Sequence, residues 1–186
     1  MPQSWKDANV TPLHKKGTRQ QCSNYRPVSL TSQVVKLLER IIYDHILKLL
    51  LSNRFISCDQ HGFQEGCSCI TQLLDCLFDW CTNFDHKYET HIVYLDFAKA
   101  FDTVPHTRLL HKLKQAGVRG KVHRWIEGFL RGRRQRVVLR NGISGWQRVT
   151  SGVPQGSILG PLLFLVYAND IPGIISSMVK LFADDT

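Results

Sequence analysis

Residues 92–96 (IVYLD) form an apolar run that ends on an aspartate, and residues 181–185 (LFADD) repeat the pattern. Runs this rich in β-branched and aromatic residues are typical of strands buried in a sheet. A buried carboxylate loses hydration, which is costly unless a cation or hydrogen-bond donors offset the loss. Taken alone, either aspartate is more simply explained as the cap of a following helix. Together, Asp96, Asp184 and Asp185 predict a site for two divalent cations about 4 Å apart, the arrangement used for in-line phosphoryl transfer.

The composition of the chain limits the classes of molecule that it is expected to bind. The chain has 186 residues, 43% of them hydrophobic, which is enough for one domain or part of a larger one. Its formal net charge of +9 favours a polyanionic partner, either nucleic acid or an anionic membrane. The longest apolar stretch, residues 37–51, is interrupted by charged side chains, and no secretory signal is recognisable. We therefore expect nucleic acid rather than a membrane. The six cysteines lack paired C-x-x-C spacing, so we expect reduced thiols and no zinc site.

Positive charge is concentrated in one part of the chain. No acidic residue occurs between Gly128 and Asn169. A solvated surface normally mixes both signs, so an arginine-only stretch of this length indicates contact with phosphates. A basic surface without a ligand is the alternative. The arginines predicted to bind nucleic acid are Arg131, Arg133, Arg134, Arg136, Arg140 and Arg148.

The remaining patterns predict an α+β fold. Residues 8–14 and 25–30 are expected to form a hairpin with a basic loop, and the Asn141-Gly142 pair predicts a second hairpin from residues 134–140 to 144–150. Apolar side chains at helical spacing predict the helices. These helices begin near Ser32, Ser68, Pro105, Lys121 and Ile158.

Other residues suit the needs of a nucleotide triphosphate. Its outer phosphates require cations, and its base requires a surface to lie on. The site must also distinguish a deoxyribose from a ribose. Phe101, five residues after Asp96, is placed to close the space of a 2′-hydroxyl, and the turn at residues 154–156 offers the platform. The candidate cations are Lys15, Lys16 and Arg26.

Five ordered blocks resemble one family. They are NYRPVSL (residues 24–30), QHGF (60–63), YLDFAKAFD (94–102), GVPQGS (152–157) and FADD (182–185). This order is similar to that of reverse transcriptases, and more narrowly to the RNA-directed DNA polymerase of non-LTR, LINE-type, jockey-like retrotransposons. The NYRPVSL motif favours this class over a group II intron maturase-like polymerase.

The resemblance implies the fingers and palm of a right-hand polymerase. Residues 1–88 would be partial fingers, and residues 89–186 a palm whose antiparallel sheet packs on helices. The family continues beyond the second aspartate block into a thumb, which is absent here, as is the endonuclease. The resemblance thus implies a truncated fragment of a mobile element that is inactive alone. The alternative is a non-catalytic remnant that binds nucleic acid.

The resemblance also assigns roles to individual residues. Asp96, Asp184 and Asp185 would be catalytic and would hold two Mg²⁺ ions, or Mn²⁺, with the carbonyl of Phe97 as a further ligand. The partners would be an RNA template, a DNA primer and a dNTP. Residues 60–62 would contact the template strand or pack within the fingers. The positions that resemble the nucleotide site are Arg26 with Lys15 or Lys16 at the triphosphate, Phe101 as the gate against ribonucleotides, and Gln155 and Gly156.

Overall fold

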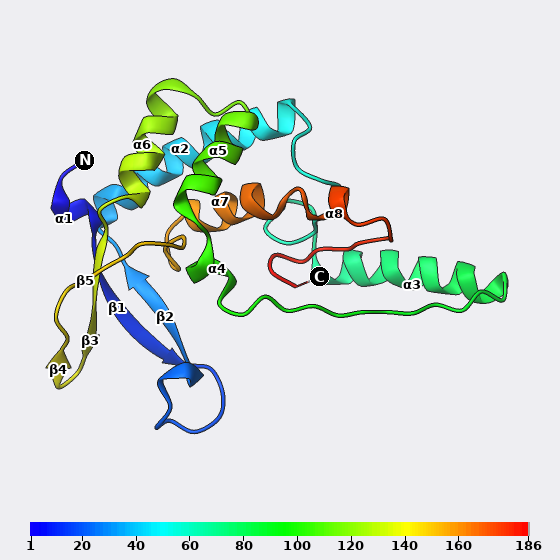
Figure 1. Ribbon diagram of the computed structural model, residues 1–186, viewed down its shortest axis with the longest axis horizontal. Helices are drawn as coiled ribbons and strands as arrows, with labels where there is room; N and C mark the ends of the chain where they lie inside the picture. The colour runs from blue at the N-terminus through cyan, green and yellow to red at the C-terminus, as the bar shows by residue number, and fades with distance from the viewer. Residues whose placement is uncertain (186) are drawn as a thin grey trace.

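A group of helices packs beside a mixed β-sheet, and one long helix extends away from the group (Figure 1). The structure is a computed structural model that describes residues 1–185. The strands are β1 (Asp7–His14), β2 (Tyr25–Leu30), β3 (Arg134–Leu139), β4 (Gly142–Ile143) and β5 (Gln147–Arg148). The helices are α1 (Gln3–Lys6), α2 (Gln33–Ser52), α3 (Cys69–Asp85), α4 (Ala100–Thr103), α5 (His106–Gln115), α6 (Gly120–Leu130), α7 (Leu159–Ala168) and α8 (Ile171–Ile174), with a 3₁₀ turn at Cys22–Asn24.

The sheet joins segments that are far apart in the sequence. β1 pairs antiparallel with β2, so the first predicted hairpin is confirmed. β1 also pairs in parallel with β3, with Asp7 opposite Arg134. β3 turns back through Arg140 and Asn141 to meet β4 and then β5, which confirms the second hairpin with its turn one residue earlier than the predicted Asn141-Gly142 pair. The strand order is β2-β1-β3-β4, with β5 on β3. This sheet is therefore mixed rather than wholly antiparallel.

The core is built around α7. This helix is apolar on all sides and buries eight of its ten residues. α2 is amphipathic and turns Val35, Ile42, Ile46 and Leu50 inward, where they join the same core. Residues from both halves of the chain thus share one core. The fingers–palm boundary near residue 88 remains a prediction.

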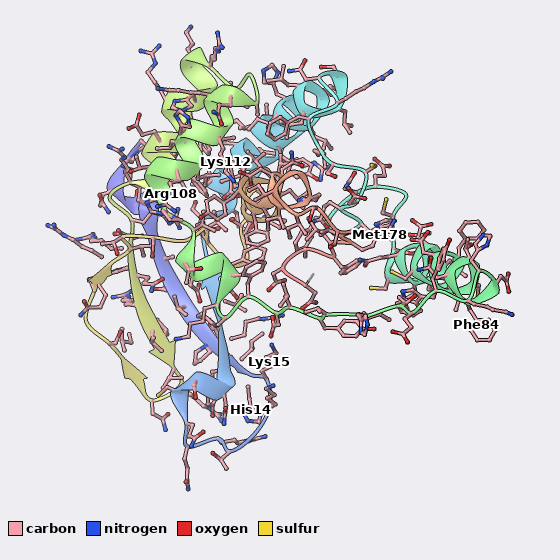
Figure 2. The ribbon with its side chains drawn as sticks, turned by 45° about the vertical axis from the view of Figure 1, so that its right-hand side comes forward. His14, Lys15, Phe84, Arg108, Lys112 and Met178 are labelled. Atoms are coloured by element: carbon pink, nitrogen blue, oxygen red, sulfur yellow. The ribbon has the colours of Figure 1, made fainter. Side chains whose placement is uncertain are left out.

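The predicted helices are all present. α3 begins with a capping box, in which the Ser68 hydroxyl accepts from the Thr71 N–H and the Thr71 hydroxyl accepts from the Ser68 N–H. Unlike the other long helices, α3 buries none of its residues. Figure 2 shows Phe84, which is 82% exposed, near the outer end of this helix. None of the helices within residues 1–185 is both long and apolar enough to cross a membrane.

The prediction of two buried strands ending on aspartate was wrong in its secondary structure. Residues 92–95 are extended but form no strand, and their side chains are exposed, with Tyr94 at 79%. Residues 181–185 form isolated bridges instead of a ladder, although Leu181 and Ala183 are buried. The physical reason is a missing neighbour, because among residues 1–185 no strand pairs along residues 92–95 to cover them.

The two faces of α2 provide a test of this packing. We expect Ile46→Ala to lower the free energy of unfolding by about 2–5 kcal/mol, because the side chain is fully buried and its removal leaves a cavity. The control Ile41→Ala removes the same atoms at a position that is 61% exposed, and should change stability by no more than about 0.5 kcal/mol. Urea titration followed by circular dichroism measures both. Equal losses would contradict the assignment of the buried face.

Candidate polymerase active site

The backbone brings the predicted catalytic aspartates together. Asp96 and Asp185 form an isolated antiparallel bridge, although 89 positions separate them in the sequence. A tight turn precedes Asp185, in which the Phe182 N–H donates to the Asp185 carbonyl at 2.8 Å and the Asp185 N–H donates to the Phe182 carbonyl at 3.0 Å. Asp184 lies within this turn and is half-buried. The convergence predicted from the sequence therefore exists at the level of the main chain.

The electrostatics of this turn are those of crowded carboxylates. Burial raises the pKa of Asp185 above its usual value, the charges of Asp184 and Asp96 raise it further, and the charge of Lys15 opposes them. Like charges that disfavour one another's ionisation are relieved by a bound cation. Positive charge would therefore stabilise the ionised carboxylates of this site, and Lys15 supplies only part of it.

The donor atoms suit magnesium, but they are not yet gathered around one point. Among residues 1–185, no group of three or more His, Cys, Asp or Glu side chains is arranged to hold a metal ion. The available ligands are the carboxylates of Asp96, Asp184 and Asp185, with the Phe97 carbonyl adjacent in sequence to Asp96. Mg²⁺ prefers oxygen ligands and retains several waters, so this donor set fits its chemistry. Binding requires the side chains to move closer together.

The turn at residues 152–157 is tied to the segment that follows Asp96. The Val153 N–H donates to the Phe101 carbonyl at 2.7 Å, and the side-chain amide of Gln155 donates to the Asp102 carboxylate at 3.1 Å. Gly152, at φ +88°, is needed here because a Cβ would lie 2.7 Å from the Phe101 carbonyl oxygen. Gln155 is thereby placed beside the helix that carries Phe101.

The same turn also contacts β2. The Ser29 N–H donates to the Gln155 carbonyl at 2.8 Å. Gly156, at φ +95°, lies so close that an added Cβ would be 2.9 Å from the Ser29 carbonyl oxygen. A cavity of about 340 Å³ opens at this junction and is bordered by Gln155, Lys99 and Arg148, among others. The structure thus gives Gln155 a position at an open, basic recess.

Phe101 lies in an aromatic cluster. Its ring stacks on Phe164 with centroids 4.8 Å apart and meets Phe63 edge-on at 6.0 Å. Phe101 is only half-buried, so part of its ring faces outward. These contacts hold the ring in place. A residue that limits the space near a sugar must be held in this way.

The three basic side chains predicted to bind the triphosphate lie on the β1–β2 hairpin. Lys15, Lys16 and Arg26 are all exposed. The sequence did not distinguish the two lysines; of the two, it is Lys15 whose charge lowers the pKa of the Asp185 carboxyl. Figure 2 shows Lys15 next to His14, where β1 ends.

The arginine stretch is less uniform than the sequence indicated. The Arg133 side chain is only 3% exposed, so its assignment to a nucleic-acid surface was wrong. It lies over the Phe129 ring at 4.9 Å, and burial lowers the pKa of its guanidinium, against the charges of Glu39 and Asp7. Arg133 therefore packs inside the protein and does not belong to the exposed basic surface.

Other arginines in the stretch have protein partners. Arg134 makes a two-point contact with the Asp7 carboxylate at 2.6 and 3.0 Å, and Arg136 donates to the Asn9 side chain at 2.9 Å. Both guanidinium groups also lie over the Trp146 ring, at 5.2 and 4.4 Å from its centroid. Arg131 pairs with Glu127 at 3.2 Å. Arg140 and Arg148 are exposed and make no salt bridge to any residue from 1 to 185.

Sequence reasoning missed one buried acidic residue that supports the site. Glu39 is fully buried on α2, and its carboxylate accepts from the Ile158 N–H at 2.8 Å and the Leu159 N–H at 3.1 Å. It thus caps α7 directly after the Gln155 turn. Its spacing from Val35 and Ile42 placed it on the apolar face of α2, which was the available signal.

Comparison with known proteins agrees with this geometry. A family profile described as "Reverse transcriptase (RNA-dependent DNA polymerase)" matches residues 13–186. The chain belongs to the reverse transcriptase family. It is 34% identical over 190 residues to the "Probable RNA-directed DNA polymerase from transposon X-element" of Drosophila melanogaster, a match that covers 99% of the chain and 21% of that relative. It is also 32% identical over 194 residues to the "RNA-directed DNA polymerase from mobile element jockey" of the same organism, covering 100% of the chain and 21% of the relative.

These relatives confirm the narrower resemblance to non-LTR retrotransposon polymerases. The reverse transcriptase chain spans about a fifth of their length. Among solved structures, apo telomerase from Candida tropicalis superposes with a TM-score of 0.67 at 11% identity, covering 99% of this chain and 43% of that one. Agreement at so low an identity supports the fold alone, and it accords with the α+β fingers and palm expected from the sequence.

The buried carboxyl of Glu39 predicts a pH dependence of stability. Burial raises the pKa of Glu39, and the hydrogen bonds from Leu159 and Ile158 and the charge of Arg133 oppose this rise. Because the native state then binds the proton more tightly than the unfolded state, the contribution of Glu39 to stability is present below the ordinary glutamate pKa and is lost as pH rises through the folded value. The difference in unfolding free energy between the wild type and Glu39→Gln should therefore fall with rising pH. Chemical denaturation at a series of pH values measures it, and a rising difference would contradict the assignment.

Proposed function

We propose that this chain forms the nucleotidyl-transfer site of an RNA-directed DNA polymerase. The observation that carries the proposal is the backbone bridge between Asp96 and Asp185, which joins the two distant segments that carry the three aspartates. In such a site, a dNTP is added to the 3′-hydroxyl of a DNA primer opposite an RNA template. Bound divalent ions, two Mg²⁺ or Mn²⁺, would lower the pKa of the attacking hydroxyl and neutralise charge on the pyrophosphate that leaves.

The side chains around the aspartates have distinct tasks in this proposal. Asp96, Asp184 and Asp185, with the Phe97 carbonyl, hold the cations. Lys15 is the stronger candidate for the outer phosphates, because it already lies within electrostatic reach of Asp185. Point charges of this kind stabilise the charge that develops on a transferring phosphoryl group.

Selection of the nucleotide falls to a second group. Gln155, at the basic recess where Lys99 and Arg148 also lie, and Gly156, the residue after it, contact the incoming nucleotide. Arg26 on the exposed edge of β2 assists at the triphosphate. The ring of Phe101, held by Phe63 and Phe164, excludes a 2′-hydroxyl by its bulk.

The template and primer require a basic surface. Arg140 and Arg148 are the arginines of the stretch best placed to bind phosphates, since they are exposed and not engaged in salt bridges within residues 1–185. Arg131, Arg134 and Arg136 contribute less, because each already has a partner in the protein. The thumb and endonuclease expected from the sequence would complete the binding of nucleic acid in a longer protein.

A non-catalytic remnant that only binds nucleic acid is the second candidate. It is favoured by one observation, that within residues 1–185 the acidic side chains are not already grouped around a metal position. Binding of metal to the three aspartates distinguishes the two candidates.

We expect the 186-residue chain to bind Mn²⁺, measured by electron paramagnetic resonance, and Asp96→Asn to weaken this binding by about 10-fold or more, because one carboxylate of a shared site is lost. Asp85→Asn, which removes an exposed aspartate at the end of α3, is the matched control and should leave binding unchanged. Primer extension on poly(rA)/oligo(dT) by a longer protein that contains this chain should be lost with Asp96→Asn. Equal Mn²⁺ binding by all three proteins would favour the remnant.

Single-stranded RNA should bind with an affinity that falls steeply with salt. Each of Arg140→Ala and Arg148→Ala should reduce the slope of log K against log salt by about one, because one phosphate contact is lost. Arg133→Met is the internal comparison, and its slope should not change because the side chain is buried. Fluorescence anisotropy with a labelled oligonucleotide measures all four proteins. A flat salt dependence in the wild type would remove the basic surface from the proposal.

A further inference from the structure

A glutamine from the first half of the chain holds the turn that carries the aspartate pair. The Gln60 side chain is 3% exposed. Its carbonyl oxygen Oε1 accepts from the Ala183 N–H at 3.0 Å, and its nitrogen Nε2 donates to the Ala183 carbonyl at 3.4 Å. One side-chain amide therefore engages both polar groups of the residue that precedes Asp184.

Ala183 needs such support. Its φ is +59°, in the left-handed region that residues with a Cβ rarely adopt. A strained backbone persists only where its surroundings fix it. The Phe182 and Asp185 main-chain bonds close the turn, and Gln60 holds its middle from outside.

The segment around Gln60 and the segment around Ala183 approach each other very closely. Gly62 lies where an added Cβ would be 2.1 Å from the Ala183 nitrogen, so only glycine fits there. The Gly62 N–H donates to Gln60 Oε1 at 2.7 Å, which orients the amide. The main chains also pair, since the His61 N–H donates to the Leu181 carbonyl and the Leu181 N–H donates to the Asp59 carbonyl, each at 2.8 Å.

We propose that Gln60 is a positioning residue for the catalytic aspartates. By fixing Ala183 in the left-handed conformation, it sets how Asp184 and Asp185 are presented to Asp96 and to the cations between them. Gln60 itself touches neither metal nor nucleotide. This role rests on the proposed function, and it differs from the template contact or packing role that the sequence suggested for residues 60–62.

The first test is amide exchange in the 186-residue chain. Gln60→Met keeps the length of the side chain but removes its hydrogen bonds, so the Ala183 amide should exchange roughly tenfold faster, as expected when one buried hydrogen bond is lost. Gln60→Glu retains an acceptor oxygen and should restore most of the protection. Exchange in α7 should be unchanged in both variants, which would show that the core remains folded. Unchanged exchange at Ala183 in Gln60→Met would overturn the proposal.

The second test is metal binding, because a structural role alone would not change it. Gln60→Met should weaken Mn²⁺ binding by about 10- to 100-fold, the usual effect of losing a group that orients metal ligands. Gly62→Ala should do the same by steric displacement of Ala183. Gly128→Ala is its control, since a Cβ there meets no atom within 4 Å.

The outcomes separate the two proposals. Faster exchange at Ala183 with unchanged Mn²⁺ affinity in Gln60→Met would overturn the positioning role. If Asp96→Asn leaves Mn²⁺ binding unaltered, the proposed function fails instead, and the exchange measurement still decides whether Gln60 holds the turn.

Discussion

The backbone bridge between Asp96 and Asp185 joins two distant segments that together carry three carboxylates. The pKa of Asp185 is raised by burial and by the charges of Asp184 and Asp96, which is the cost of keeping these groups in one place. The backbone bridge from Asp96 to Asp185 and the hydrogen-bonded turn that begins at Phe182 hold this arrangement. A bound cation would relieve this repulsion, so the geometry and the proposed chemistry depend on the same interaction.

Both loops of the candidate site are held by buried polar side chains from the amino-terminal half. Glu39 caps the helix that follows the Gln155 turn, and Gln60 holds Ala183 before the aspartate pair. Buried polar groups are costly unless they are hydrogen-bonded, and one carboxylate oxygen of Glu39 and both ends of the Gln60 amide have such partners. Residues from the amino-terminal half thus orient loops that carry the proposed catalytic residues of the carboxy-terminal half. A change in one half is therefore expected to act on the chemistry of the other.

The arginine stretch shows how tertiary pairing changes the meaning of a charge pattern. No acidic residue lies near Arg134 in the sequence, but parallel pairing of β1 with β3 places Asp7 directly opposite it. Arg133, its neighbour just before β3, is buried over the Phe129 ring. The surface that remains for phosphates is smaller than the sequence indicated, and it centres on Arg140 and Arg148.

The sequence by itself determined the helices, the two hairpins and the identity of the three aspartates, because these follow from local periodicity, turn residues and short motifs. Only the tertiary structure decided that residues 92–95 form no strand, that Arg133 is buried, and that Gln60 reaches Ala183. The reason is physical: each of these outcomes depends on contacts between segments separated by tens of residues or more, and local pattern carries no information about which distant segment will supply the partner.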